Sequence, residues 1–108
     1  MTFSINSVEW TISLVSKNDL LNLYKDNNDE DCNFAFGVCI YSEHRILINK
    51  DMCIDQQINT LKHELTHCYI FNYGLFNVPN FTEEMVCDLV SSIHNFINEV
   101  VNNFKKYY

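Results

Sequence analysis

The sequence predicts an α+β fold, in which a small antiparallel or mixed sheet of about three strands packs on two helices. Two apolar runs between residues 33 and 49, separated by a short turn, indicate a β-hairpin. Residues 54–73, and the segment from about 82 to 104, have the apolar spacing of amphipathic helices. With 108 residues, of which 47% are hydrophobic, we expect a single domain over 1–108 with a modest core.

Residues 8–15 (VEWTISLV) form the first expected strand, because β-branched and aromatic residues dominate them. Trp10, Ile12 and Leu14 alternate with polar residues, so these three side chains should share the face that packs on the core. We expect residues 1–7, which precede this strand, to be a flexible lead-in.

A short polar segment follows the first strand. Ser16 or Asn18 is a suitable N-cap for a short helix over 19–24. The acidic run 27–31 lacks the glycine and the ligand spacing of a calcium-binding loop, so we interpret it as a solvated turn.

The predicted hairpin begins with the strand 33–41 (NFAFGVCIY). Residues 42–44 form its turn, and 45–49 (RILIN) return as the antiparallel partner. This hairpin leads directly into the most informative part of the chain.

Residues 54–73 form a long helix, which Asp51 or Asp55 is expected to cap and which Gly74 should end. Its apolar side is predicted to comprise Ile54, Ile58, Leu61, Leu65 and Cys68. A separate polar stripe comprises Gln56, Thr60, His63 and His67. A helix buried only for structural reasons would not need two histidines in that stripe.

The polar stripe contains the motif H-E-x-x-H, formed by His63, Glu64 and His67. Residues four apart on a helix project from one face, so both imidazoles can meet one zinc ion. Glu64 lies about 100° around the helix from His63, which suits a general base better than a third ligand.

The last helix is expected to begin near Asn80 or Thr82, after a loop over 75–80, and to reach about Phe104. Glu84 and Asp88 lie one helical turn apart near its start. We expect Glu84 to be the third zinc ligand and Asp88 to accept the second ring N–H of a ligating histidine. Other assignments for the third ligand remain open, namely Asp88, Cys68 and Cys87, whereas Glu83 suits the helix dipole.

The rest of the last helix has a broad apolar face, comprising Val86, Leu89, Val90, Ile93, Phe96, Ile97, Val100 and Phe104. This face should pack on the sheet, on the N-terminal segment or on a second copy of the chain. We therefore expect a monomer, or a homodimer formed through this helix.

H-E-x-x-H followed by E-x-x-x-D at Glu84 and Asp88 resembles the pattern of gluzincin metallopeptidases. Residues 34–91 also resemble the small ImmA/IrrE-type metallopeptidases of bacteria and phages, in which a short sheet precedes the motif helix. The resemblance implies a minimal zincin-like domain that binds Zn²⁺. It further implies an edge strand beside the zinc helix that pairs with an extended substrate.

The function implied by the resemblance is zinc-dependent endopeptidase activity on a specific protein substrate, such as a transcriptional repressor. Glu64 would act as general base on a zinc-bound water. A side chain from elsewhere would stabilise the oxyanion, and the candidates are Tyr69, Tyr73, His94, Tyr107 and Tyr108. The alternative is a non-catalytic zincin-fold binding protein, a phage or host-defence factor that captures a partner protein.

The composition of the chain limits which binding partners and which cellular compartment we expect. The formal net charge of −7 disfavours binding to nucleic acid, because phosphates carry the same charge. We expect no membrane association, since no apolar run is long enough to cross a bilayer. Five cysteines without a C-x-x-C pair, together with no signal peptide, indicate a cytoplasmic protein without a disulfide framework. We interpret His44 and His94 as surface or packing residues.

Overall fold

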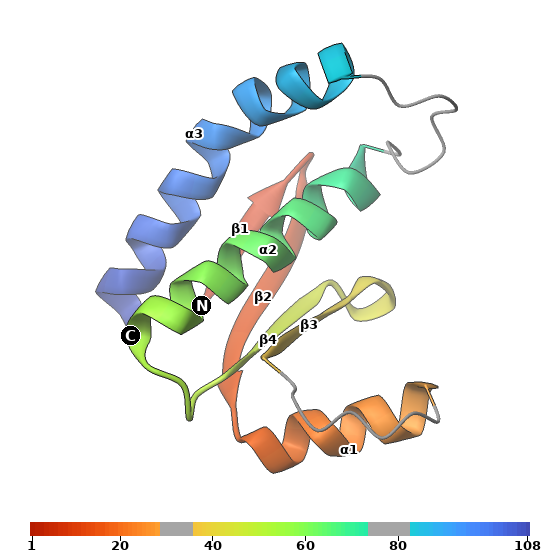
Figure 1. Ribbon diagram of the computed structural model, residues 1–108, viewed down its shortest axis with the longest axis vertical. Coiled ribbons are helices and arrows are strands. Elements are labelled where there is room, and N and C mark those ends of the chain that lie inside the picture. The colour runs from red at the N-terminus through yellow and green to blue at the C-terminus, as the bar shows by residue number, and fades with distance from the viewer. Residues whose placement is uncertain (29–35, 74–82) are drawn as a thin grey trace.

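A computed structural model describes residues 1–28, 36–73 and 83–108 (Figure 1). It has a four-stranded mixed sheet with α-helices on both of its faces, which confirms the α+β class. In chain order the elements are β1 (Thr2–Ile5), β2 (Val8–Val15), α1 (Lys17–Asn28), β3 (Gly37–Ile40), the 3₁₀ turn η1 (Tyr41–Glu43), β4 (Arg45–Asn49), α2 (Ile54–Asn72) and α3 (Glu83–Tyr107).

The strand order is β1-β2-β4-β3, so the expectation of about three strands was wrong by one. The additional strand is β1, which lies in the segment expected to be a flexible lead-in. Asn6 and Ser7 have φ values of 51° and 64°, the left-handed conformation that a two-residue hairpin turn requires. They turn β1 back onto β2 as its antiparallel partner, and Ile5 becomes buried.

The centre of the sheet is a parallel pair formed by β2 and β4, with Ile12 in register with Ile46. The predicted hairpin is confirmed, since β3 pairs with β4 in antiparallel fashion. The first strand of that hairpin is shorter than expected, because Tyr41 belongs to η1 and Phe36 precedes β3. Residues 33–35 lie outside the described part. β3 is the outer strand on this side of the sheet.

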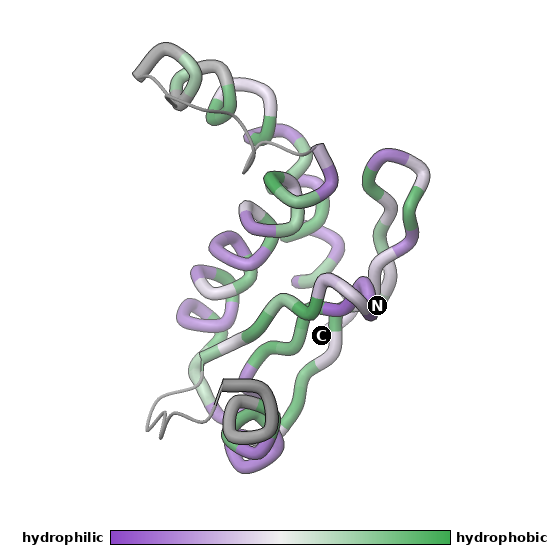
Figure 2. Tube along the Cα trace, turned by 90° about the vertical axis from the view of Figure 1, so that its right-hand side faces the viewer, coloured by the Kyte–Doolittle hydropathy of each residue, from purple (hydrophilic) through white to green (hydrophobic). Residues whose placement is uncertain are grey.

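Two layers of helices enclose the sheet, with α1 on one side and α2 with α3 on the other (Figure 1). Alternate residues of β4 point to opposite sides. Leu47 packs against Leu20 of α1, whereas Ile46 and Ile48 join the larger core with α2 and α3. Figure 2 shows the hydrophobic stretches of the strands lying between these helices. As predicted, Trp10, Ile12 and Leu14 share one face, and all three belong to the larger core.

The helix α1 is longer than predicted at both ends, because it begins at Lys17, before the expected Asp19, and reaches Asn28. The Ser16 hydroxyl accepts a hydrogen bond from the backbone N–H of Asp19 at 3.1 Å, so Ser16 is the cap. Part of the acidic run that we interpreted as a turn therefore belongs to this helix. The remainder of that run lies outside the described residues.

The helix α2 ends one residue before the predicted position, at Asn72. Its N-cap is Cys53, and no side chain caps it, so the expectation that Asp51 or Asp55 is the cap was wrong. A carboxylate oxygen of Asp51 instead accepts a hydrogen bond from the backbone N–H of Lys17. Leu61, Leu65 and Cys68 are fully buried as predicted. Ile54, the first residue of α2, is 50% exposed, so the predicted apolar side is not buried at this end of the helix.

The helix α3 runs antiparallel to α2 and is three residues longer at its C-terminal end than predicted (Figure 1). Its second half completes the larger core, with Val100, Val101 and Phe104 buried. Nearer its middle, Phe96 contacts the ring of Phe3 on β1 at 5.8 Å. The positions expected to end α2 (Gly74) and to start the last helix (Asn80 or Thr82) lie outside the described residues.

Candidate metal centre

The two histidines of the motif converge. The Nε2 atoms of His63 and His67 lie 3.1 Å apart, and the ring planes meet at 75°. Both residues lie on the exposed side of α2, one helical turn apart, while Leu61 and Leu65 face the core. Because the apolar residues of α2 face the core, both imidazoles project from the same exposed side of the helix.

This geometry fits a zinc ion. Two ligands at 2.0–2.1 Å in tetrahedral coordination are separated by roughly 3.3 Å, close to the observed 3.1 Å between the Nε2 atoms. Two neutral imidazoles in direct contact can form only one N–H···N hydrogen bond. A cation between the two nitrogens would satisfy both lone pairs together, so His63 and His67 are suitable as two of the ligands.

Glu64 lies on the inner side of the same helical turn and is only 8% exposed. Burial raises the pKa of its carboxyl group, and the neighbouring His63 partly offsets this by lowering it. A carboxylate with a raised pKa is a better proton acceptor near neutral pH than a solvated one. Glu64 therefore has the environment of a general base, as the motif predicts.

The pKa of His67 is lowered, first by burial of part of its ring and second by the charge of His63. A lowered pKa keeps the imidazole neutral at neutral pH. Only the neutral ring has a lone pair on each unprotonated nitrogen that can bind a metal ion. The electrostatics of this pair thus favour metal binding over protonation.

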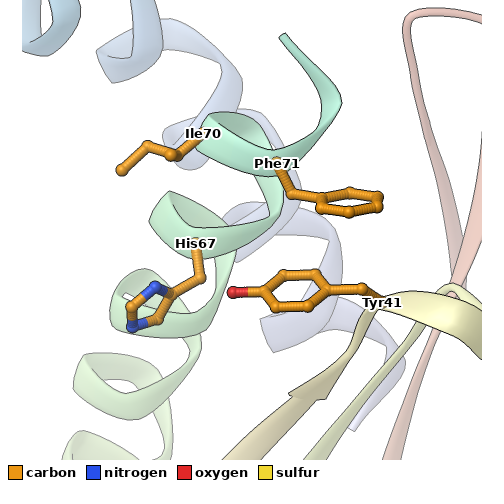
Figure 3. Close-up of a pocket in the computed structure, with 4 residues that line it drawn as sticks. All are labelled: Tyr41, His67, Ile70 and Phe71. Carbon is orange, nitrogen blue, oxygen red and sulfur yellow. The ribbon is translucent and has the colours of Figure 1, made fainter. Parts of the chain in front are cut away.

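Tyr41 is a residue that the sequence analysis did not select. It begins η1, directly after the outer strand β3, and its hydroxyl points toward the ring of His67 (Figure 3). Burial raises the pKa of this phenol, with smaller contributions from Cys39, Glu64 and Cys68, so the hydroxyl keeps its proton as a hydrogen-bond donor. The only signal in the sequence was its place at the end of the first strand of the hairpin that precedes the motif helix.

A pocket of about 380 Å³ opens beside His67 (Figure 3). Tyr41, His67, Ile70 and Phe71 line it. The ring of Tyr41 stacks on that of Phe71, with centroids 4.6 Å apart and planes at 17°. Three of the four lining residues are therefore aromatic or aliphatic, and the fourth is a histidine of the motif.

The predicted third ligand lies on another element. Glu84, with its neighbour Glu83 and with Asp88, belongs to the first two turns of α3, and these three side chains lie outside the described part. The described residues contain no group of three metal-binding side chains. The helices α2 and α3 contact each other where Tyr69 packs on Phe96. Glu84 lies twelve residues before Phe96 in the chain, which corresponds to a distance of roughly 18 Å along α3.

The two cysteines considered as alternative third ligands, Cys68 and Cys87, differ in their surroundings. Cys68 is fully buried, and burial raises the pKa of its thiol to about 12, which opposes the thiolate form that binds metal. The side-chain amide of Asn72 approaches its sulfur at 3.5 Å. Cys87 is exposed on α3. The environment of Cys68 is that of a small core residue.

The candidates proposed for oxyanion stabilisation lie in different places. The Tyr108 hydroxyl donates to the carbonyl of Ile12 at 3.0 Å, on β2, and Tyr107 packs beside it. Tyr69 and Tyr73 pack on each other with ring centroids 4.6 Å apart. His94 lies 3.1 Å from the side-chain amide of Asn98. His44, which we interpreted as a surface or packing residue, packs its ring on Trp10.

No protein family, curated protein or solved structure matches this chain. In the described residues, no helix combines the length and the apolar character needed to cross a membrane.

Proposed function

We propose that this protein is a zinc-dependent endopeptidase that hydrolyses a specific protein substrate. The observation that carries the proposal is the 3.1 Å approach of two imidazole nitrogens beside a buried carboxylate on one helical turn. Three side chains of one motif thereby provide two metal ligands and one base. The resemblance to ImmA/IrrE-type metallopeptidases supports the same conclusion.

His63 and His67 would hold the zinc ion, with Glu84 as the proposed third ligand and Asp88 supporting a ligating histidine. When bound, zinc polarises the scissile carbonyl and lowers the pKa of a water molecule toward ~7. Because Glu84 comes from the start of α3, we expect metal binding to draw that end of α3 toward α2.

Glu64 would accept a proton from the attacking water and deliver it to the leaving amine. Its buried position raises its basicity and keeps bulk water away from the carboxylate. The Tyr41 hydroxyl, which faces the same region, would donate a hydrogen bond to the oxygen on which negative charge develops (Figure 3). We therefore propose Tyr41 as the hydrogen-bond donor to the oxyanion, in place of the five residues considered from the sequence.

The position of β3 favours a substrate that binds in an extended conformation. It is the outer strand of the sheet, its partner on the other side is β4, and it lies next to α2. A peptide that pairs with β3 on the side away from β4 would pass the histidines in an extended conformation. We propose a regulator such as a repressor as substrate, in the cytoplasm, with no role for nucleic acid or membrane binding.

The decisive experiment combines metal analysis with the variant Glu64→Gln and with a matched pair of variants at Glu84 and Glu83. The purified protein should contain about one zinc per chain. Glu64→Gln should retain zinc and lose cleavage of proteins from the source cell by at least roughly 100-fold. Cleavage by Glu64→Gln at the parent rate would overturn the mechanism.

The third ligand is tested by exchanging neighbouring carboxylates. Glu84→Gln should weaken zinc affinity by at least about tenfold, as expected when a ligand is removed. Glu83→Gln makes the same chemical change one position earlier and should leave the affinity unchanged. Equal affinities for both variants would exclude Glu84 and direct the search to Asp88.

A further inference from the structure

We infer that the pocket lined by Tyr41, His67, Ile70 and Phe71 selects a large apolar side chain of the substrate next to the scissile bond. This inference rests on the proposed function, because it takes His67 as a ligand of the catalytic metal. It adds the chemical class of the residue that the enzyme recognises.

The position of the pocket follows from helix geometry. Ile70 and Phe71 come three and four residues after His67, so they lie on the same side of α2, one turn further along. Tyr41 comes from the end of β3 and stacks on Phe71, so the two aromatic rings together form one wall of the pocket (Figure 3). A peptide paired with β3 would therefore place one side chain here while its backbone passes His67.

The walls are apolar and well supported. The Tyr41–Phe71 stack covers one side, and the edge of Phe71 in turn meets the ring of the fully buried Trp10 at 6.5 Å. Phe71 and Tyr41 are nevertheless 36% and 38% exposed, so a ligand has aromatic surface left to cover. The side chains that line the pocket in the described part include no carboxylate, lysine or arginine.

The size of the pocket agrees with one side chain. Pockets for complete small-molecule ligands span about 300–1,000 Å³, and the volume here, about 380 Å³, is near the lower limit. A leucine or phenylalanine side chain therefore has room to enter it. A lysine or arginine side chain would lose its hydration and find no carboxylate on these walls.

Two small chelating probes test the inference, N-acetyl-phenylalanine hydroxamate and N-acetyl-alanine hydroxamate. Both carry the same zinc-binding group and differ only in the side chain next to it. Calorimetry on the zinc-loaded protein should show that the phenylalanine probe binds about 10- to 100-fold more tightly, since burying a large apolar side chain has that effect. Equal affinities would overturn the inference.

Substitutions in the pocket test whether the preference for the phenylalanine probe arises from these residues. Ile70→Trp should fill the pocket and reduce the preference for the phenylalanine probe to less than about threefold, while the alanine probe binds as before. Phe71→Ala, which removes an aromatic wall, serves if Ile70→Trp does not fold. Ile54→Ala is the control, because Ile54 is an exposed isoleucine on the same helix, about 24 Å away, and it should keep the full preference.

A metal-free measurement separates the inference from the proposed function. Without zinc, N-acetyl-phenylalanine amide should still shift the NMR signals of Ile70 and Phe71 more than N-acetyl-alanine amide does. If this occurs while neither hydroxamate binds the zinc-treated protein, the proposed function fails and the apolar pocket stands. If both hydroxamates bind equally tightly, the metal site stands and the pocket preference is wrong.

Discussion

Gly37 of β3 lies directly against Thr60 of α2. A β-carbon on Gly37 would come within 2.7 Å of the Thr60 methyl group and 3.0 Å of the carbonyl oxygen of Leu47. The glycine thus allows the motif helix to approach the outer strand, one turn before His63. The distance between β3 and the two histidines of α2 depends on this contact.

Gly37→Ala is therefore expected to lower the free energy of unfolding by about 1–3 kcal/mol, as overpacking does in a tight core. Thermal unfolding measures the change. Adding Thr60→Ala to the same chain removes the nearer clash and should recover part of the loss. No recovery in the double variant would place the strain at Leu47 instead.

His63→Ala should abolish stabilisation by zinc. At a zinc concentration about 100 times the dissociation constant, the ion adds about 2.7 kcal/mol to the parent, which corresponds to roughly 10–20 °C in Tm for a domain of this size. His94→Ala is the matched control, because that exposed histidine lies on α3 beside Asn98. A zinc-dependent Tm in His63→Ala would contradict the site.

The stability of the metal-free protein should decrease in mildly acidic solution because of His67. Its pKa in the folded state lies below the ordinary value of 6.5, so the unfolded chain binds the proton first. The free energy of unfolding should thus be constant above about pH 7 and decline as the pH falls below 6.5. Urea titrations of the parent and of His67→Ala, in which this decline should be smaller, provide the comparison.

Tyr41→Phe should reduce kcat roughly 10- to 100-fold, since the phenol would stabilise a developing negative charge. KM should change little, because the phenylalanine ring can still stack on Phe71. Tyr107→Phe, at a largely exposed tyrosine near the end of α3, should retain full activity. A kcat of Tyr41→Phe equal to that of the parent would remove Tyr41 from the mechanism.

Glu64→Gln should stabilise the metal-free protein at neutral pH. Burial raises the folded-state pKa of Glu64 above its ordinary value of 4.5, so stability decreases as the pH rises from there through the folded value. The uncharged amide avoids this cost, and we expect a Tm about 2–5 °C higher at pH 7 and no gain near pH 4. Glu99→Gln, an exposed exchange on α3, should leave Tm unchanged at both pH values.

Local patterns predicted the elements that surround the motif. The limits of α2 were correct within one residue, and the antiparallel pairing of β3 with β4 was anticipated. Both depend on periodicity and turn residues within short segments. The convergence of His63 and His67 also follows from the pitch of a single helix.

Features that depend on distant parts of the chain were missed. Four residues, Thr2–Ile5, are too short a run to indicate a strand, and they pair only because the next strand is available. The parallel alignment of β2 with β4, which α1 and β3 separate along the chain, has no local signal. Tyr41 lies near His67 only after the sheet and α2 pack together, so spacing along the sequence could not select it.

The single tryptophan of the chain, Trp10, gives the protein an internal optical reporter. Its indole is fully enclosed and touches the edge of Phe71, and its Nε1 atom has no hydrogen-bond partner in the described residues. Emission from such an apolar environment should be blue-shifted and sensitive to displacement of its neighbours. Titrations with metal or peptide can thus be followed by intrinsic fluorescence, without attaching a dye near the histidines.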